Sequence, residues 1–363
     1  MKIGIDISQI VYGTGVSIYT RELVRNLLKL NLTNEYVLYG GSLRQKKFLT
    51  RYCASLSGRF TAKIYPIPPT IANLIWNRLH ILPIEKLIGK VDVFHFSDWT
   101  QPPTTAFSVT TVHDLAPLRF PKLVHPKVYY AHKNRLNHVK READRIIVPS
   151  EATKKELLEF GVSAEKIRVI YEAPEDIYYK RSEEEVQKVM AKYKIRGSYL
   201  LAVGVGQRKN TERLIKAYEL ATAGSSLKLV IVGKPLNKIP EGRGINFLGF
   251  IPTQDLPALY SGAEALLYPS LYEGFGLPIL EAFAVGCPVV TSNLSSMTEI
   301  AGDAAVLVDP YEIESISEGI KKVLKGKIGF SKKGLTIANK YSWQKTALET
   351  LKVYQEAKKI KII

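Results

Sequence analysis

The residues best suited to chemistry lie in one stretch, YPSLYEGFGLPILEAFAVGCPVV, at positions 268–290. Its pattern predicts a strand, a glycine-containing loop, a helix and a second strand. The free N–H groups and the dipole at the start of such a helix favour a bound phosphate. Glu273 precedes the loop and Glu281 lies about one turn inside the helix, so both carboxylates can accept hydrogen bonds from sugar hydroxyl groups. Taken alone, Glu281 could equally be a partner of the helix dipole.

Further candidate residues stand at the ends of other predicted strands. Arg208 and Lys209 follow the strand predicted at 198–204, and His113 lies at the end of another strand. Ligands of parallel sheets bind outside the carboxyl ends of the strands, which makes these side chains candidates for a binding site. A basic pair at such a place is also consistent with a surface cluster, and a single histidine with a structural role.

The first predicted strand is followed by a loop that contains Gly13 and Gly15. These glycines either allow a ligand to approach the backbone or form a tight turn between strand and helix. Asp6, Asp98 and Trp99 also lie at strand ends, where they either line a substrate site or stabilise their loops. The sequence leaves both alternatives open.

Short apolar strands alternate with helices along the whole chain. We expect the strands at 2–7, 35–40, 91–97, 108–114 and 143–150, and then at 198–204, 227–233, 245–250, 265–269, 287–292 and 304–309. This alternation predicts an α/β fold with parallel, doubly wound sheets that are covered by helices on both faces. Because the pattern restarts after residues 171–180, we expect two Rossmann-like domains that face a central cleft. The last helix is predicted to be amphipathic.

The composition excludes some classes of protein and limits the partners that we expect. The chain has 363 residues, 46% of them hydrophobic, and a net charge of 51 − 34 = +17, which excludes wholesale disorder. Residues 1–145 carry 21 basic and 9 acidic side chains, so this half should attract anions such as nucleic acid, acidic lipids or phosphorylated substrates. No nucleic-acid-binding motif accompanies the charge, and we expect no nucleic-acid partner.

Other features of the sequence bear on where in the cell the protein is found. Two cysteines, Cys53 and Cys287, cannot build a disulfide framework or a cysteine zinc cluster. There is no apolar run of the roughly 18–20 residues that a membrane span needs, and the N-terminus alternates like a strand. We therefore expect a cytoplasmic protein, with peripheral attachment to the inner face of a membrane as an open alternative.

The segment EGFGLPILEAFAVGCPVV resembles the donor-binding motif of the retaining glycosyltransferases of family 4, which have the GT-B fold. The similarity covers nearly the whole chain. Further matching motifs follow in the family's order, namely GTGVSIYTREL (13–23), TVHDLAPLRFP (111–121), VPSEATKKEL (148–157), RKNTERLIKAY (208–218), FLGFIP (247–252) and AGDAAVLVDP (301–310). The resemblance implies an acceptor-side domain at 1–172, a nucleotide-sugar donor domain at 173–340, and a C-terminal helical segment, 341–363, that returns to the first domain.

The same resemblance implies roles for the candidate residues. Arg208 and Lys209 would bind the donor diphosphate, whereas His113 and Glu273 would hold the transferred sugar, with His113, Glu273 and Lys209 as the catalytic set. The further donor-binding residues would be Gly13, Gly15, Gly274, Phe275, Gly276, Leu277 and Glu281. Val205 stands where the family often has an arginine, which leaves Arg208 to supply the second positive charge. Asp114 would orient the imidazole of His113 or cap the following turn.

The implied reaction is the transfer of a hexose from a nucleotide-diphosphate sugar to a hydroxyl group of a glycan or lipid-linked acceptor, with no cofactor. The chain contains no D-x-D triplet, which agrees with a reaction that needs no metal. Mannose from GDP-mannose is the favoured donor, since the motifs look like those of bacterial mannosyltransferases in cell-surface polysaccharide synthesis. UDP-glucose, UDP-N-acetylglucosamine, a non-catalytic nucleotide-sugar-binding protein and a phosphorylase-like enzyme with pyridoxal phosphate are the alternatives.

Overall fold

The computed structural model describes residues 1–30, 33–234 and 244–360. The chain divides into two compact units, the first formed by Met1–Glu172 with the C-terminal segment from Trp343, and the second by Ala173–Ser342. No described helix combines the length and the apolar character that crossing a bilayer requires.

The first unit contains a seven-stranded sheet in the order β3-β2-β1-β4-β5-β6-β7, in which all neighbours are parallel. The strand order reverses between β1 and β4, and this is where ligands of doubly wound sheets bind. The strands are β1 (Lys2–Asp6), β2 (Glu35–Gly41), β3 (Phe60–Tyr65), β4 (Val93–Phe96), β5 (Phe107–Thr111), β6 (Arg145–Val148) and β7 (Ile167–Val169).

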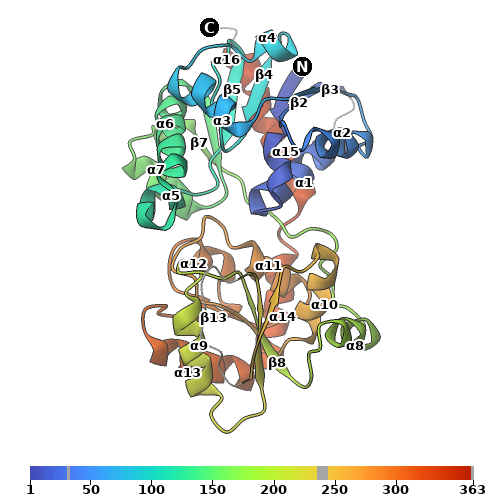
Figure 1. The fold of residues 1–363 in the computed structure, drawn as a ribbon, viewed down its shortest axis with the longest axis vertical. Coiled ribbons are helices and arrows are strands. Elements are labelled where there is room, and N and C mark those ends of the chain that lie inside the picture. The colour runs from blue at the N-terminus through green and yellow to red at the C-terminus, as the bar shows by residue number, and fades with distance from the viewer. Residues whose placement is uncertain (31–32, 235–243, 361–363) are drawn as a thin grey trace. The chain divides into compact units, whose positions relative to one another are not determined.

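Helices cover this sheet on both faces. Helices α1 and α15 pack side by side (Figure 1), while the π-helix η2 and helix α4 bury apolar side chains with β2 and β4. The helices are η1 (Ser8–Tyr12), α1 (Gly15–Leu30), α2 (Lys46–Ala54), α3 (Pro69–Ala72), η2 (Asn73–Arg78), α4 (Glu85–Ile88), α5 (Ala116–Arg119), η3 (Pro121–Leu123), α6 (Pro126–Glu142), α7 (Glu151–Glu159), η4 (Ala164–Lys166), α15 (Trp343–Gln355) and α16 (Ala357–Ile360).

The second unit repeats this architecture with a six-stranded parallel sheet in the order β10-β9-β8-β11-β12-β13. Its strands are β8 (Tyr199–Val203), β9 (Lys228–Val232), β10 (Ile245–Gly249), β11 (Leu266–Tyr268), β12 (Val289–Ser292) and β13 (Ala305–Val308). Its order reverses between β8 and β11.

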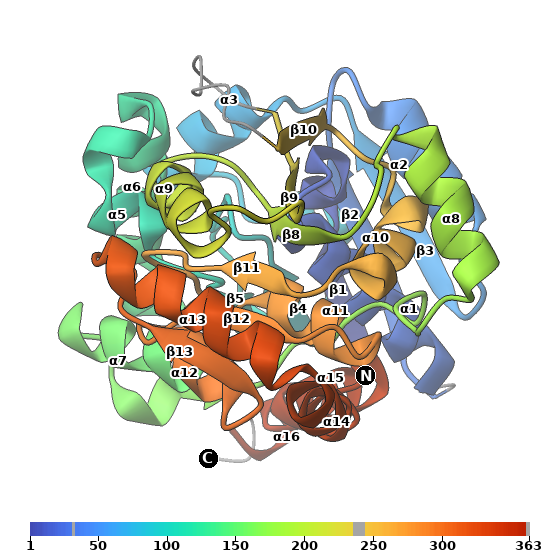
Figure 2. The same ribbon diagram turned by 90° about the horizontal axis from the view of Figure 1, so that it is seen from below.

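In the second unit, α9 and α13 pack on one face of the sheet through a shared apolar cluster, and α10 and α11 cover the opposite face (Figure 2). The helices are α8 (Glu183–Lys192), α9 (Thr211–Ala221), η5 (Thr253–Asp255), α10 (Leu256–Gly262), α11 (Leu277–Ala284), α12 (Ser296–Ala301), α13 (Ile313–Lys325) and α14 (Lys327–Ala338). Two Rossmann-like units with parallel sheets confirm the predicted fold class.

Every strand predicted from the sequence is present, with ends that differ by a few residues. Two strands, β3 and β7, were not predicted. Both lie at an edge of the sheet, where little burial is needed: β3 is mostly exposed or half-buried, and β7 has three residues. The C-terminal helix begins at Trp343, and the apolar face predicted for it is buried, with Trp343, Ala347, Leu351 and Tyr354 all inaccessible or nearly so.

Candidate functional site

In the second unit, two loops meet where the strand order reverses. One loop follows β8 and carries Arg208 and Lys209, and the other follows β11 and carries Glu273. The backbone amide of Leu271 donates a 2.9 Å hydrogen bond to the carbonyl of Arg208, and the Arg208 Nη1 donates to the carbonyl of Tyr272 at 3.1 Å. These bonds hold the two predicted motifs together at the carboxyl ends of the strands.

Glu273 joins the two basic side chains. Lys209 Nζ lies 2.6 Å from Glu273 Oε1, and Arg208 Nη1 lies 3.3 Å from Glu273 Oε2. Lys209 also donates a 2.6 Å hydrogen bond to the hydroxyl of Tyr268, whose ring it contacts at 4.7 Å from the centroid. The Glu273 side chain is 10% exposed, whereas those of Lys209 and Arg208 are 21% and 31% exposed. The cluster therefore has one buried anion beneath two partly accessible cations.

The electrostatics keep Glu273 ionised. Burial by itself would raise the pKa of the Glu273 carboxyl, but the charges of Lys209 and Arg208 outweigh it, so that the pKa lies below its usual value. The sequence suggested a basic pair for phosphate and a separate carboxylate for a sugar. In the structure all three side chains belong to one network with a net charge of +1.

Gly204 makes room for the lysine. Its φ is +89°, and a Cβ atom built there would lie 2.9 Å from Lys209 Cε. A side chain at this position would therefore meet both backbone strain and the stem of Lys209. The strand-ending glycine thus directs the Lys209 side chain across the end of β8.

Glu281 lies deeper in the second unit, on α11. Its Oε2 accepts a 2.9 Å hydrogen bond from the hydroxyl of Tyr260, and the hydroxyl of Tyr178 also donates to this carboxylate. Burial raises the pKa of Glu281 to about 7, although the two tyrosine hydroxyls act in the opposite direction. Glu281 is therefore poised to change charge near neutral pH, unlike an ordinary glutamate on a helix.

The loop before α11 is fixed by side chains from α12 and its cap. The carbonyl of Glu273 accepts hydrogen bonds from Ser295 Oγ at 2.7 Å and Ser296 Oγ at 2.9 Å. Gly276 has a φ of +108° and precedes the first residue of the helix, Leu277. Within the predicted donor-binding segment of Gly274, Phe275, Gly276 and Leu277, the Phe275 side chain is buried and packs edge-on against Tyr341.

In the first unit, His113 is held by two neighbours. Its Nδ1 lies 3.0 Å from Glu172 Oε1, and the ring of Tyr19 packs against the imidazole with a centroid distance of 4.6 Å. Burial alone would lower the pKa of His113, but the hydrogen bond and the charge of Glu172 raise it above its usual value. The other ring nitrogen, Nε2, is buried and has no hydrogen-bond partner among the described residues. Such an atom is suited to bind a hydroxyl group of a ligand.

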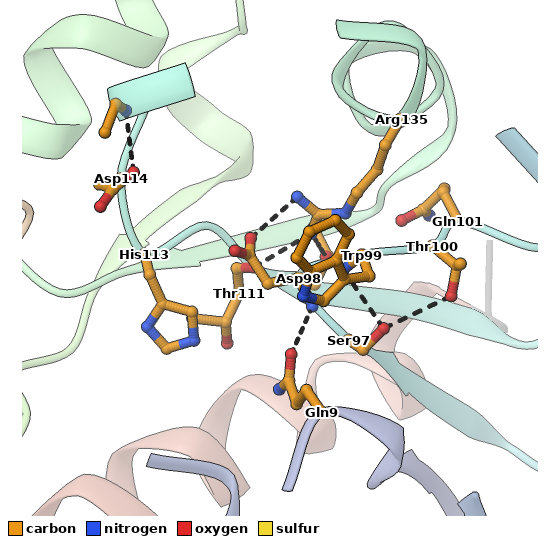
Figure 3. A network of polar contacts seen from close by, with 12 residues as sticks. Gln9, Ser97, Asp98, Trp99, Thr100, Gln101, Thr111, His113, Asp114 and Arg135 are labelled. Atoms are coloured by element: carbon orange, nitrogen blue, oxygen red, sulfur yellow. Dashed lines mark hydrogen bonds and ion pairs between the residues drawn. The ribbon is translucent and has the colours of Figure 1, made fainter. Parts of the chain in front are cut away.

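The aspartates near His113 have other partners (Figure 3). Asp114 points away from the imidazole, and its Oδ1 accepts a 2.8 Å hydrogen bond from the amide of Ala116 at the start of α5. Of the two roles left open for Asp114, the structure shows the turn cap. Asp98 forms a 3.1 Å ion pair with the buried Arg135 from α6.

Of the remaining strand-end residues, one stabilises its own loop and the other lines a pocket. Asp6 accepts hydrogen bonds from the amide and the hydroxyl of Ser8 and stabilises the turn after β1. Trp99 instead lines a pocket at the carboxyl ends of β1 and β4, with four of the other lining residues being Gln9, Tyr12, Tyr39 and Trp76. The hydroxyl of Tyr39 is buried and has no hydrogen-bond partner within the described chain. Tyr12 is 40% exposed, and an accessible aromatic face of this kind can receive a sugar ring.

The glycine loop leaves space above the first helix. Gly13 has a φ of +66°, which ends η1 in the left-handed region, and Gly15 is the first residue of α1. A Cβ atom at either position would meet no atom within 4 Å. Packing therefore does not require glycine at position 15, and the backbone is open to a ligand.

The Gly15→Ala substitution tests this interpretation. We expect folding stability to be unchanged or raised by up to about 1 kcal/mol, because alanine is the better helix former. The transfer rate should nevertheless fall, because the added methyl group would occupy the space above the backbone. Thermal melting and a transfer assay on the same preparation check both effects, and full activity of the variant would contradict a binding role for this loop.

Several important residues were missed by the sequence reasoning. Glu172 orients His113 across 59 positions, and Tyr268 and Tyr260 hydrogen-bond to Lys209 and Glu281. Tyr268 is the first residue of the stretch 268–290, so its aromatic ring and hydroxyl group were a usable signal. Nothing in the local pattern indicates Glu172. Its role arises only because the fold brings it next to His113, which follows β5.

Comparisons with known proteins identify the family to which the chain belongs. Residues 13–173 match the family model described as Glycosyltransferase Family 4, and residues 186–340 match that of Glycosyl transferases group 1. The O-antigen chain mannosyltransferase B of Escherichia coli is 31% identical over an alignment that covers 94% of this chain and 96% of the relative. The O-antigen chain mannosyltransferase RfbU of Salmonella typhimurium is 30% identical over 59% of this chain and 60% of its own length.

Solved structures show the same fold. Sucrose-phosphate synthase from Thermosynechococcus elongatus superposes with a TM-score of 0.72 at 19% identity, covering 98% of each chain. WaaG, a glycosyltransferase of lipopolysaccharide biosynthesis, superposes with a TM-score of 0.69 at 14% identity over 98% of this chain and 99% of its own. With two Rossmann-like units, family-4 and group-1 domains and a full-length relative, the chain belongs to the family-4 glycosyltransferases of GT-B fold.

Proposed function

We propose that the protein transfers mannose from GDP-mannose, with retention of configuration and without a metal ion, to a glycan or lipid-linked acceptor in cell-surface polysaccharide synthesis. The observation that carries this proposal is the cluster of Lys209, Arg208 and Glu273 at the reversal point of the second sheet. Its surplus of one positive charge suits the diphosphate of a nucleotide sugar. The choice of mannose is supported by the O-antigen mannosyltransferases among the relatives.

In this proposal the protein acts by positioning and by charge. Lys209 and Arg208 stabilise the negative charge that grows on the diphosphate as its bond to the sugar breaks. Glu273 keeps both side chains in place by ion pairs at 2.6 and 3.3 Å. The main chain at the start of α11 adds its dipole. Glu172 accepts a hydrogen bond from Nδ1 of His113 and holds the ring, which leaves Nε2 to hydrogen-bond to a sugar hydroxyl.

For the acceptor, we propose that a sugar residue stacks on the accessible aromatic rings at the carboxyl ends of β1 and β4 in the first unit. Tyr12 and Trp99 lie 5.7 Å apart between ring centroids and provide apolar faces for the sugar. The excess of basic residues in positions 1–145 favours a phosphorylated lipid carrier at an anionic membrane surface. A peripheral position at the inner face of the membrane fits this acceptor.

The decisive experiment is a thermal-shift screen of GDP-mannose, UDP-glucose and UDP-N-acetylglucosamine, followed by a transfer assay. A nucleotide sugar present at ~100 times its dissociation constant should add roughly 2.7 kcal/mol of apparent stability. We expect GDP-mannose to give the largest shift, and transfer to be faster with a lipid-linked acceptor in anionic vesicles than in neutral ones. A larger shift with a UDP-sugar would show that this nucleotide sugar, and not GDP-mannose, is the donor. Binding without release of nucleotide diphosphate for any acceptor would indicate a non-catalytic binding protein.

A further inference from the structure

A side-chain cluster in the first unit has no part in the proposed transfer chemistry. It consists of His80, His138 and Glu142, whose ligand atoms all lie within 4.8 Å of one another. His138 and Glu142 lie at i and i+4 on α6 and so share one face of this helix. His80 follows the π-helix η2, which packs against α6. The cluster therefore joins two elements that are distant in sequence.

The hydrogen bonds of the two histidines define which nitrogens carry hydrogen. His80 Nδ1 lies 2.9 Å from the carbonyl oxygen of Trp76, and His138 Nε2 lies 3.3 Å from that of Asn77. A carbonyl oxygen can only accept, so each of these ring nitrogens is the donor. In a neutral ring, the opposite nitrogen then presents a lone pair.

Both lone pairs face the same carboxylate. His80 Nε2 lies 2.7 Å from Glu142 Oε2, and His138 Nδ1 lies 3.2 Å from Glu142 Oε1. At these distances the carboxylate needs positive charge on or beside the rings, which either a second ring proton or a bound cation supplies. Arg141 supplies part of this charge, since its Nη2 lies 3.0 Å from His138 Nδ1. The Arg141 side chain is 65% exposed and can turn into solvent at low cost.

We propose that His80, His138 and Glu142 bind one divalent transition-metal ion of the Zn²⁺ type, which links η2 to α6. Two imidazoles and a carboxylate, with water in the fourth position, are a common ligand set for this ion. The carbonyl groups of Trp76 and Asn77 provide the outer hydrogen bonds that orient metal-bound histidines.

Metal binding requires a small local rearrangement. The two imidazole rings are stacked, with centroids 3.8 Å apart and planes at 10°, so one ring has to tilt before both lone pairs point to one centre. The backbone already holds His80 in an unusual conformation, with a φ of +51°. The proposed ion has a structural role in the first unit, and none of the residues assigned to donor binding takes part.

The test uses the full-length protein, stripped of metal with a chelator and then titrated with Co²⁺ and Zn²⁺. We expect one Co²⁺ per chain, with the visible absorption of a four-coordinate ion, and a rise in melting temperature with Zn²⁺. Glu142→Gln and His80→Asn should each weaken binding by about 100-fold or more, because each removes a ligand. Asparagine tolerates the positive φ of position 80, and Glu142 is partly exposed, so both variants should fold.

The matched control is His125→Ser, which removes a histidine outside the cluster and keeps a side chain able to cap α6. This variant should bind Co²⁺ like the parent protein. Absence of stoichiometric binding, or binding that survives both Glu142→Gln and His80→Asn with native circular dichroism, would overturn the proposal. Either result would leave the proposed transfer function untouched.

Discussion

Replacing Lys209 by alanine should lower kcat for sugar transfer by about 10²–10³-fold, the loss that follows removal of one preorganised group that stabilises transition-state charge. The structure supports this expectation because the Lys209 side chain is 21% exposed and lies at the reversal point of the second sheet. The ammonium group should matter most as the diphosphate leaves, so kcat should fall more than the affinity for the donor. Steady-state kinetics with GDP release as the readout measure both.

Lys209→Ala should also lower the free energy of unfolding, which therefore has to be measured together with the kinetics. Lys209→Ala leaves the Glu273 carboxylate buried with Arg208 as its remaining cation, and we expect a cost of about 1–3 kcal/mol in the free energy of unfolding. Lys192→Ala is the matched control, since Lys192 also forms a 2.6 Å ion pair, with Asp255, but on the surface of the same unit. The control should keep full activity. Activity of Lys209→Ala within about threefold of the parent would exclude its role as the phosphate-binding group.

Replacing Glu281 by glutamine should weaken GDP binding by about 10- to 100-fold, because hydrogen bonds from the ribose hydroxyls to a charged acceptor contribute roughly 1.5–3 kcal/mol. In the parent protein the pKa of Glu281 is about 7, so GDP affinity should rise between about pH 6 and 8 as the carboxylate forms. The variant cannot ionise and should show no such rise. Isothermal titration calorimetry across this pH range measures both proteins.

The same substitution weakens GDP binding but should raise the folding stability of the protein above neutral pH. A carboxyl whose pKa is about 7 in the folded state, against 4.5 as its model value, holds its proton more tightly when folded. Its contribution to stability is therefore greatest below the unfolded pKa and decreases as the pH rises toward the folded pKa. The difference corresponds to roughly 3 kcal/mol. Glu281→Gln should thus be more stable than the parent at about pH 8, but not at about pH 5.

A matched control separates the ribose role from general charge effects. Glu264→Gln removes a carboxylate that pairs with Lys327 at 2.5 Å elsewhere in the second unit, and it should leave GDP affinity unchanged. Equal GDP affinity of Glu281→Gln and the parent at about pH 8 would reject the ribose role. The greater stability of the variant at about pH 8 would still be expected, since it follows from the raised pKa of the buried carboxyl and not from ribose binding.

The sequence by itself determined the layout of both units. Apolar strands separated by amphipathic helices can bury their surfaces only in parallel, doubly wound sheets, and each predicted strand is present. Local signals also set helix boundaries: Ser150 caps α7 through its 3.0 Å bond to the Thr153 amide, and Gly276 precedes α11 with a positive φ. Such features depend on neighbours within a few positions, which is why a local pattern contains them.

Only the tertiary structure decided which side chains act together. Lys209 and Glu273 are 64 positions apart, and His113 and Glu172 are 59 apart, yet each pair is in contact. Charge states followed from burial, as the pKa of about 7 for Glu281 shows. Hydrogen bonds and desolvation act over a few ångströms in space, whereas sequence patterns report spacing along the chain. The edge strands β3 and β7 stayed hidden for the same reason, because their pairing partners rather than their own residues place them in the sheet.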